Sequence, residues 1–227
     1  MNCIYCFKQI VSDLSWENII TGMKTSNLCF ECTHSFIPLN GLLCKKCSAE
    51  TKSEICDDCL KWSKLYNNED VLTKNYAAFK YNEFTQNFVA RWKYQGDFIL
   101  IKGIKELITP YIKENLKHFD ESFTILPIPL SKERLEERAF NQAFLLAELI
   151  GESETAILIR KDNEKQSKKT KQERINTINS FKINKKITGK VLLVDDIYTT
   201  GTTLRHAASL LKQSGASEVN SFTFIRG

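Results

Sequence analysis

Apolar and polar residues follow two different periods in the part of the chain after residue 75. Short apolar runs rich in β-branched and aromatic residues predict strands over 76–81, 122–129, 155–160, 191–194 and 219–225, with brief pairing at 181–183. Apolar residues at helical spacing predict helices over 83–93, 98–118, 133–150 and 203–214. Because strands that alternate with helices favour a parallel sheet covered by helices, we expect an α/β fold.

Breaker residues and charge runs set the limits of these elements. Pro110 predicts a kink or a fresh start within its helix, and Gly151 predicts the end of the helix that begins at Glu133. The segment from Lys161 to Arg174 is too charged and too poor in apolar residues to pack against a core. We therefore expect it to be flexible in the free protein.

The residues from 191 to 203 combine a buried strand, a polar loop and the start of a helix. Val191 to Val194 predicts a buried parallel strand that stops at Asp195 and Asp196, and a hydroxyl-rich loop follows. Because the first amides of a helix lack partners and the helix dipole is positive there, such a loop can hold a phosphate. The adjacent carboxylates favour a ligand that also carries sugar hydroxyls or a divalent cation. A phosphorylated ribose with Mg²⁺ meets all three requirements; the alternative is an ordinary strand-to-helix turn with polar caps.

This stretch resembles the 5-phosphoribosyl-1-diphosphate (PRPP) signature of type I phosphoribosyltransferases. The resemblance implies that Asp195 and Asp196 bind the 2′ and 3′ hydroxyls of the ribose in Mg²⁺-PRPP. It also implies that the 5′-phosphate is held by the loop residues Thr199, Thr200, Gly201, Thr202 and Thr203. The resemblance thus predicts a parallel-sheet, type I phosphoribosyltransferase-like domain.

The cysteines form a second set of candidate ligands at the other end of the chain. All eight lie in the first 59 residues as four CxxC pairs: Cys3/Cys6, Cys29/Cys32, Cys44/Cys47 and Cys56/Cys59. Two such pairs make a tetrahedral Cys₄ zinc site, so we expect two structural zinc ions. The simplest arrangement joins the first two pairs and the last two, and an interleaved, cross-braced pairing is the alternative. Redox dithiols or buried free cysteines do not explain four copies in so short a region.

The charge is unevenly distributed between the two ends of the chain. The 227 residues carry a formal net charge of +5. Residues 1–62 hold six Lys/Arg against seven Asp/Glu, a balance of −1, which leaves +6 for the remainder. Each zinc bound by four thiolates adds −2. The cysteine-rich region therefore lacks the positive charge expected of a nucleic-acid-binding zinc ribbon, and scaffolding or protein docking suits it better.

The hydropathy pattern bears on where the chain acts. No apolar run approaches the roughly 18 residues that a membrane helix needs, and the first residues lack the pattern of a secretory signal. We expect a cytoplasmic protein without membrane insertion. Residues 1–62 are expected to form a double zinc ribbon, and residues 70–227 the phosphoribosyltransferase-like domain.

A second strand end carries cations suited to the pyrophosphate of PRPP. The strand that closes at Pro127 and Pro129 is followed by Lys132, Arg134 and Arg138. Cations at a strand end can hold a departing pyrophosphate, although a solvated helix face is the plain alternative.

The residues around this strand end resemble one family in particular. The matching segments are Pro127 to Pro129, Arg138 to Gln142, Trp92 to Asp97, and Gln166 through Arg174 and Asn176 to Phe181. They resemble the ComF family of competence proteins, which joins an N-terminal double zinc ribbon to a phosphoribosyltransferase-like domain. The resemblance covers nearly the full length and implies a role in DNA uptake during natural transformation.

Two departures from the related patterns affect what can be predicted. Ala139 stands where the ComF pattern usually has Gly, so its methyl group would crowd a close approach of the backbone at this loop. Thr199 stands where purine-using transferases of this fold often carry an acidic residue, so neither the acceptor nor a general base can be assigned. His206 is the nearest candidate base by sequence, but a solvated or capping role suits it better.

Two functions fit these residues. In the first, the protein transfers the phosphoribosyl group of Mg²⁺-PRPP to an unknown acceptor. In the second, PRPP gates a non-catalytic module that contacts single-stranded DNA or a competence helicase. In either case, we expect the segment from Lys161 to Arg174 to close over the ligand, with Gln166 and Arg174 in contact; a solvated surface loop is the alternative.

Overall fold

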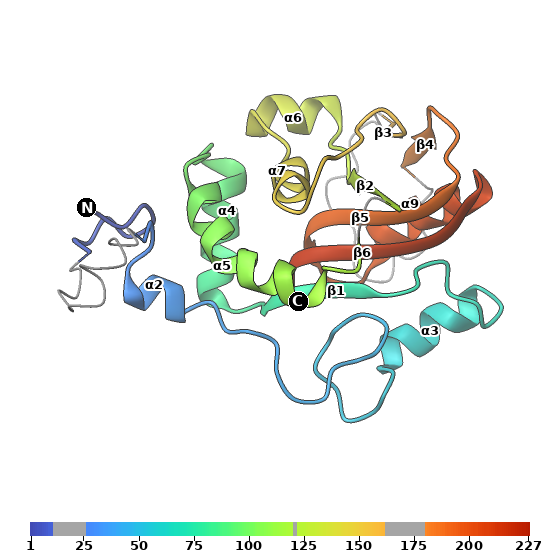
Figure 1. Ribbon diagram of the computed structural model, residues 1–227, viewed down its shortest axis with the longest axis horizontal. Helices are drawn as coiled ribbons and strands as arrows, with labels where there is room; N and C mark the ends of the chain where they lie inside the picture. The colour runs from blue at the N-terminus through green and yellow to red at the C-terminus, as the bar shows by residue number, and fades with distance from the viewer. Residues whose placement is uncertain (11–25, 120–121, 162–179) are drawn as a thin grey trace.

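A four-stranded parallel sheet forms the centre of this computed structural model, which describes residues 1–10, 26–119, 122–161 and 180–227 (Figure 1). Its strands lie in the order β1 (Asn75–Lys80), β6 (Ala216–Arg226), β5 (Gly189–Tyr198) and β2 (Phe123–Pro127). All three neighbouring pairs are parallel. A separate antiparallel pair joins β3 (Leu158–Arg160) to β4 (Phe181–Ile183). The predicted α/β class with a parallel sheet is confirmed.

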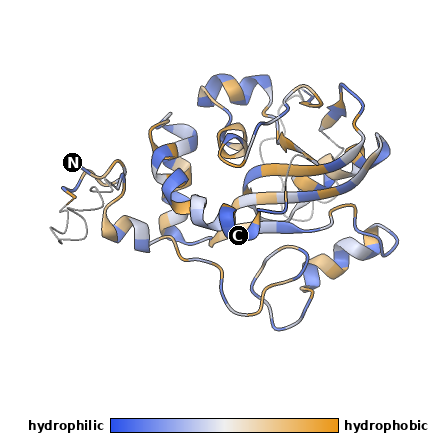
Figure 2. Cartoon of the chain, in the orientation of Figure 1, coloured by the Kyte–Doolittle hydropathy of each residue, from blue (hydrophilic) through white to orange (hydrophobic). Residues whose placement is uncertain are grey.

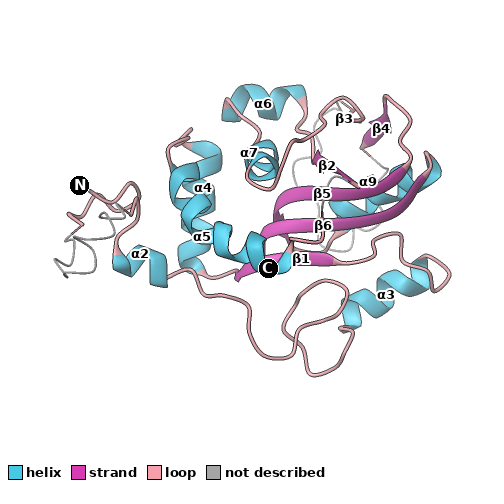
Figure 3. Cartoon of the chain, in the orientation of Figure 1, coloured by secondary structure: helices cyan, strands magenta, loops and turns pink. Residues whose placement is uncertain are grey.

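Helices pack against both faces of this sheet (Figure 3). The described helices of this part are α4 (Glu83–Tyr94), α5 (Leu100–Asn115), α6 (Lys132–Arg138), α7 (Gln142–Glu148) and α9 (Thr202–Gln213). Leu192 shares a hydrophobic core with residues of α4, α5 and α7, whereas its neighbour Leu193 shares a second core with residues of α9. This alternation along a strand buries both faces, which explains the nearly continuous apolar stretch of β5 in Figure 2.

The two cysteine groups belong to different cores. The first group lies beside α2 (Phe30–His34), and three of its cysteines share the core of α4 and α5. The second lies beside α3 (Asp57–Leu65), and three of its cysteines share the core of α9. Between α3 and β1, Leu72 is buried and Asp70 pairs with Arg205 of α9 at 2.7 Å. The second cysteine group is thus packed directly against the sheet domain.

The prediction of a single helix over residues 133–150 is wrong, because the structure has two helices in this range, α6 and α7. The chain breaks at Ala139, which has the left-handed φ of 64°. Asn141 then caps α7 by accepting a hydrogen bond from the Ala143 amide at 3.0 Å. A left-handed alanine costs about 1 kcal/mol relative to glycine, which accounts for the Gly in the related pattern at this position.

Other predicted features also differ from the structure. Strand β5 does not stop at the carboxylates but continues to Tyr198, because β6 runs beside it as far as Arg226. The strand predicted over 155–160 shortens to β3, and α5 continues through Pro110 without a fresh start. Among the helices in the described ranges, none combines the length and apolar character needed to cross a bilayer.

Candidate functional site

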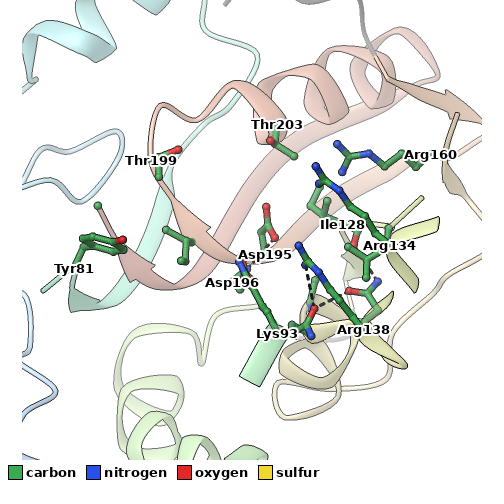
Figure 4. Close-up of a pocket in the computed structure, with 16 residues that line it drawn as sticks. Tyr81, Lys93, Ile128, Arg134, Arg138, Arg160, Asp195, Asp196, Thr199 and Thr203 are labelled. Carbon is green, nitrogen blue, oxygen red and sulfur yellow. Dashed lines mark hydrogen bonds and ion pairs between the residues drawn. The ribbon is translucent and has the colours of Figure 1, made fainter. Parts of the chain in front are cut away.

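A pocket of about 520 Å³ opens at the carboxyl ends of β2 and β5 (Figure 4). Parallel sheets bind ligands at this edge, because the strand ends and the loops that follow them converge there. Asp195 and Asp196 line the pocket from β5, and side chains of α4, α6 and the end of β3 line its other sides. Elements that lie far apart in the sequence therefore converge on the predicted acidic pair.

The acidic side of the pocket is paired with a lysine. Lys93 of α4 forms an ion pair with Asp196, which is buried, and the Asp196 amide donates to the Asp195 carboxylate at 2.9 Å. Burial, and then the charge of Asp196, raises the pKa of Asp195 to about 7. Lys93 and Arg160 oppose this rise. The pair therefore holds less negative charge near neutral pH than two ordinary carboxylates would.

Three guanidinium groups lie on the opposite side. Arg134 and Arg138 come from α6 and Arg160 from β3, and Figure 4 shows them across from the acidic pair. None of the ion pairs between described residues involves these three arginines. Burial, followed by repulsion from Arg134, lowers the pKa of Arg160. Burying positive charges close to one another is energetically unfavourable, and an anionic ligand would offset this cost by pairing with them.

Two buried donors beside these arginines support the same interpretation. Arg138 is only 8% exposed, and its Nη1 donates to the Gln142 Oε1 at 3.3 Å. Within the described part of the chain, Arg138 Nε and Gln142 Nε2 have no hydrogen-bond partner. A buried donor without a partner costs about 1–3 kcal/mol, so a ligand that accepts from both groups would recover this energy.

The threonine-rich loop divides into pocket-facing and supporting residues. Thr199 and Thr203 line the pocket, whereas Thr200 and Thr202 join their hydroxyls at 2.8 Å. Gly201 has a φ of +75°, and a Cβ there would lie 2.2 Å from the Tyr198 hydroxyl. Gly201 is also the N-cap of α9 and has no side chain to cap it, and among the first amides only that of Thr202 has a side-chain partner within the described residues, the Thr200 hydroxyl at 3.4 Å. The loop therefore leaves helix amides available to an acceptor, as expected of a phosphate loop.

The other predicted site residues are placed as follows. Arg134 and Arg138 line the pocket, but Lys132 is exposed on the first turn of α6 and is not among the lining residues. His206 lies on α9 outside the pocket lining, and burial lowers its pKa. Gln166 and Arg174 lie outside the described residues.

Among the residues that line the pocket, several were not predicted as site residues, including Lys93, Arg160, Gln142 and Tyr81. Arg160 ends a predicted strand, so the rule that ligands bind at strand ends could have identified it. Lys93 and Gln142 lie within segments that carry the ComF resemblance. Tyr81 ends the strand predicted over 76–81, so the same rule could have identified it.

The cysteines form two groups that fit zinc. Each group of four sulfur atoms lies within 4.8 Å, with members Cys3, Cys6, Cys29 and Cys32 in one and Cys44, Cys47, Cys56 and Cys59 in the other. The Sγ atoms are 3.5 Å apart for Cys6 and Cys29, and 3.6 Å apart for Cys47 and Cys56. A tetrahedral zinc site has sulfur atoms about 3.8 Å apart, given its bond lengths. Each group can hold one zinc ion, and the sequential pairing is confirmed over the cross-braced one.

Protein purified without added metal should contain two zinc ions per chain, because both groups supply four sulfur ligands. Elemental analysis of the folded protein measures this directly. A reproducible zinc content near zero in protein that melts cooperatively would contradict the assignment.

Comparison with known proteins agrees with this arrangement. Residues 141–227 match the model of the phosphoribosyl transferase domain. The chain is 36% identical over 228 residues to competence protein ComFC of Bacillus subtilis, covering 99% of this chain and 94% of that protein. It is 31% identical over 229 residues to competence protein ComFC of Streptococcus pneumoniae, covering 100% of both. Competence protein F of Haemophilus influenzae is 24% identical over 202 residues, covering 81% of this chain and 84% of that protein. The chain therefore belongs to the ComFC family of competence proteins.

Proposed function

We propose that the pocket binds PRPP with Mg²⁺ and that the protein acts in DNA uptake during natural transformation. The observation that carries this proposal is the opposition of an acidic pair to a cluster of arginines across one pocket, with a threonine-rich loop beside both. PRPP has the matching three parts: hydroxyls, a pyrophosphate and a separate 5′-phosphate. In this proposal, residues 1–62 form a double zinc ribbon and residues 70–227 the PRPP-binding domain.

Each part of PRPP has a proposed position. The ribose hydroxyls donate to Asp195 and Asp196, and the 5′-phosphate accepts from the loop between Thr199 and Thr203. Asp195 and Asp196 would also hold the Mg²⁺ of Mg²⁺-PRPP, and the pyrophosphate lies on the basic side. The proposed pyrophosphate contacts are Arg134, Arg138, Arg160 and Lys132, with Gln166 and Arg174 as further contacts.

The chemistry supported by this arrangement is the departure of pyrophosphate from C1′ of the ribose. Arginines that already surround the pyrophosphate would stabilise the negative charge that develops as the bond breaks. The described pocket lining contains no acidic side chains besides those of Asp195 and Asp196, and these are assigned to the ribose. No lining residue is therefore proposed as a general base. This observation favours, as the second candidate, a PRPP-gated module that contacts single-stranded DNA or a helicase without transfer.

One incubation distinguishes the two functions. The full chain is mixed with labelled PRPP, Mg²⁺ and a panel of nucleobases, with and without single-stranded DNA, and pyrophosphate release is measured. Release that depends on an acceptor identifies a transferase. PRPP binding that alters DNA affinity without release identifies the gated module.

The affinity for Mg²⁺-PRPP should rise as the pH increases from about 6 to 8, because the ligand needs the ionised form of Asp195. The pKa of this carboxyl is raised to about 7 in the free protein, and hydroxyl donors would lower it in the complex. Calorimetry across this range is the measurement. Asp195→Asn is the control, since it keeps the ligand's own ionisation but removes that of the protein. An equal pH dependence in both proteins would contradict the assignment.

The same raised pKa affects stability without ligand. A carboxyl whose pKa is higher in the folded than in the unfolded protein stabilises the fold most below about pH 4, and this contribution is lost as the pH rises to about 7. Asp195→Asn should therefore raise the melting temperature more at pH 8 than at pH 5.

A further inference from the structure

Arg226 and Trp62 connect the threonine-rich loop to the second cysteine group, which consists of Cys44, Cys47, Cys56 and Cys59. We propose that these two residues position the loop for the 5′-phosphate, so that ligand affinity depends on the integrity of this cysteine group. The inference rests on the proposed function, because it concerns the same pocket. It adds two positioning residues that do not line the pocket.

Arg226 makes the most extensive connection. Its Nη1 donates to the carbonyl oxygens of Tyr198 and Thr199, both at 3.2 Å. On the other side of the same guanidinium, Nε donates to the Cys47 carbonyl at 3.0 Å, and Nη2 lies 3.3 Å from the Cys47 sulfur. Arg226 is only 8% exposed. One planar group therefore fixes the start of the loop relative to a cysteine of the second group.

Trp62 makes an independent connection one residue further along the loop. Its Nε1 donates to the Thr200 carbonyl at 2.8 Å, and its side chain is buried. Trp62 lies on α3, the helix that contains Cys59 and has Cys56 as its N-cap. Movement of these cysteines would therefore move the tryptophan.

Arg205 stabilises both Trp62 and the start of the loop, because it contacts Trp62 and Tyr198. Its guanidinium lies 4.8 Å from the centre of the Trp62 ring and donates to the Tyr198 hydroxyl at 2.6 Å. Asp70 accepts from the same guanidinium at 2.7 Å. The aromatic ring is thus held by a buried, fully paired cation, which limits how far Trp62 can shift alone.

These hydrogen bonds fix three successive carbonyl groups, those of Tyr198, Thr199 and Thr200. In a trans peptide the C=O and the next N–H point to opposite sides. Carbonyls held toward the second cysteine group therefore direct the amides of Thr200 and Gly201 away from it. Over the described residues, these two amides donate no backbone hydrogen bond. Their orientation is what a phosphate bound by the loop would require.

Among the described residues, the first cysteine group has no such connection to the loop, so it provides a matched control. Its arginine contact is Arg91 of α4, which donates to the Tyr5 carbonyl and pairs with Asp97. Arg91 does not line the pocket. Arg91 thus binds the carbonyl of Tyr5, which lies between Cys3 and Cys6, and Arg226 binds that of Cys47. Of these two arginines, Arg226 alone contacts the loop within the described residues.

The test compares Trp62→Phe and Arg226→Met with Arg91→Met in the full chain with zinc. Calorimetry should show Mg²⁺-PRPP affinity falling roughly 3- to 10-fold in Trp62→Phe and at least 10-fold in Arg226→Met, according to the hydrogen bonds lost. Arg226→Lys keeps the charge but cannot bind the loop and Cys47 at the same time. Its affinity for Mg²⁺-PRPP should lie between those of wild type and Arg226→Met. Affinity for pyrophosphate alone, which does not contact the loop, should stay within about 2-fold in each variant. Arg91→Met should bind PRPP as wild type does.

A second measurement connects the loop to the cysteines themselves. Cys6→Ser and Cys56→Ser alter one half-buried cysteine in each group, and each should lower the zinc content by one ion. Only Cys56→Ser should accelerate hydrogen exchange of the amides of residues 199–203. Trp62→Phe is the mildest variant. If the arginine or cysteine variants fail to fold, it alone decides whether the loop is positioned by its contact with α3.

The outcomes separate this inference from the proposed function. If wild type binds PRPP and Trp62→Phe and Arg226→Met bind it equally well, the positioning role is wrong and the proposed function stands. If wild type does not bind PRPP, the proposed function fails, and hydrogen exchange alone decides the inference. Unchanged exchange of residues 199–203 in Trp62→Phe and Arg226→Met would overturn it.

Discussion

Asp196→Asn should weaken the binding of Mg²⁺-PRPP by roughly 10- to 100-fold, although it makes the pocket more positive. The proposed contact is a charged hydrogen bond from a ribose hydroxyl, which contributes about 1.5–3 kcal/mol, and an amide accepts more weakly and at one atom fewer. Asp195→Asn should act in the same direction. Calorimetry of the zinc-loaded chain is the measurement.

Weaker binding in Asp196→Asn could not be explained by long-range electrostatic attraction alone. PRPP is strongly anionic, so removing a negative charge without losing a contact should strengthen binding. Glu137→Gln provides the matched control, because this exposed residue of α6 does not line the pocket. It should leave affinity unchanged or raise it slightly. Binding that improves in Asp196→Asn as well would show that the carboxylate does not contact the ribose.

Arg138→Met together with Arg160→Met should weaken PRPP binding roughly 100-fold, while each alone should weaken it by about 10-fold or more. Both guanidiniums lie on the basic side of the pocket, where the pyrophosphate is proposed to bind. Affinity for ribose 5-phosphate, which lacks the pyrophosphate, should change by less than about 3-fold. The ratio of the two affinities is therefore the measured quantity.

Arg138→Met should change the stability of the free protein little. It removes a buried charge whose Nε lacks a partner within the described residues, but it also leaves the buried Gln142 Oε1 without its donor. Lys102→Met is the control, because it removes an equal charge from an exposed position on α5. It should change the affinity for neither PRPP nor ribose 5-phosphate. Equal losses for PRPP and ribose 5-phosphate in the double variant would place the pyrophosphate elsewhere.

The parts of the fold that follow local patterns were predictable from the sequence. The strand from Val191, the polar loop and the helix of α9 are encoded within about 25 consecutive residues, and each CxxC pair is encoded within four. The acidic pair was identified for the same reason, because a strand end and its loop are adjacent in sequence.

The misplaced features depend on contacts between distant segments or on unusual backbone conformations. Ala139 has good helix propensity, so the apolar stripe around it predicts one helix, and only the left-handed backbone shows the break. Strand β5 extends past Asp195 because β6 continues beside it. Lys93 pairs with Asp196, and Arg226 with Cys47, across more than 100 residues of chain. Periodicity within a segment cannot predict such pairs.

The central claim is that PRPP lies between the acidic pair and the arginines, and a crystal structure of the zinc-loaded protein with Mg²⁺-PRPP tests it most directly. We expect the ribose hydroxyls within hydrogen-bond distance of Asp195 and Asp196, the 5′-phosphate at the loop that begins α9, and the pyrophosphate beside Arg138 and Arg160. Density for PRPP outside this pocket, or with the pyrophosphate at the threonine-rich loop, would contradict the account.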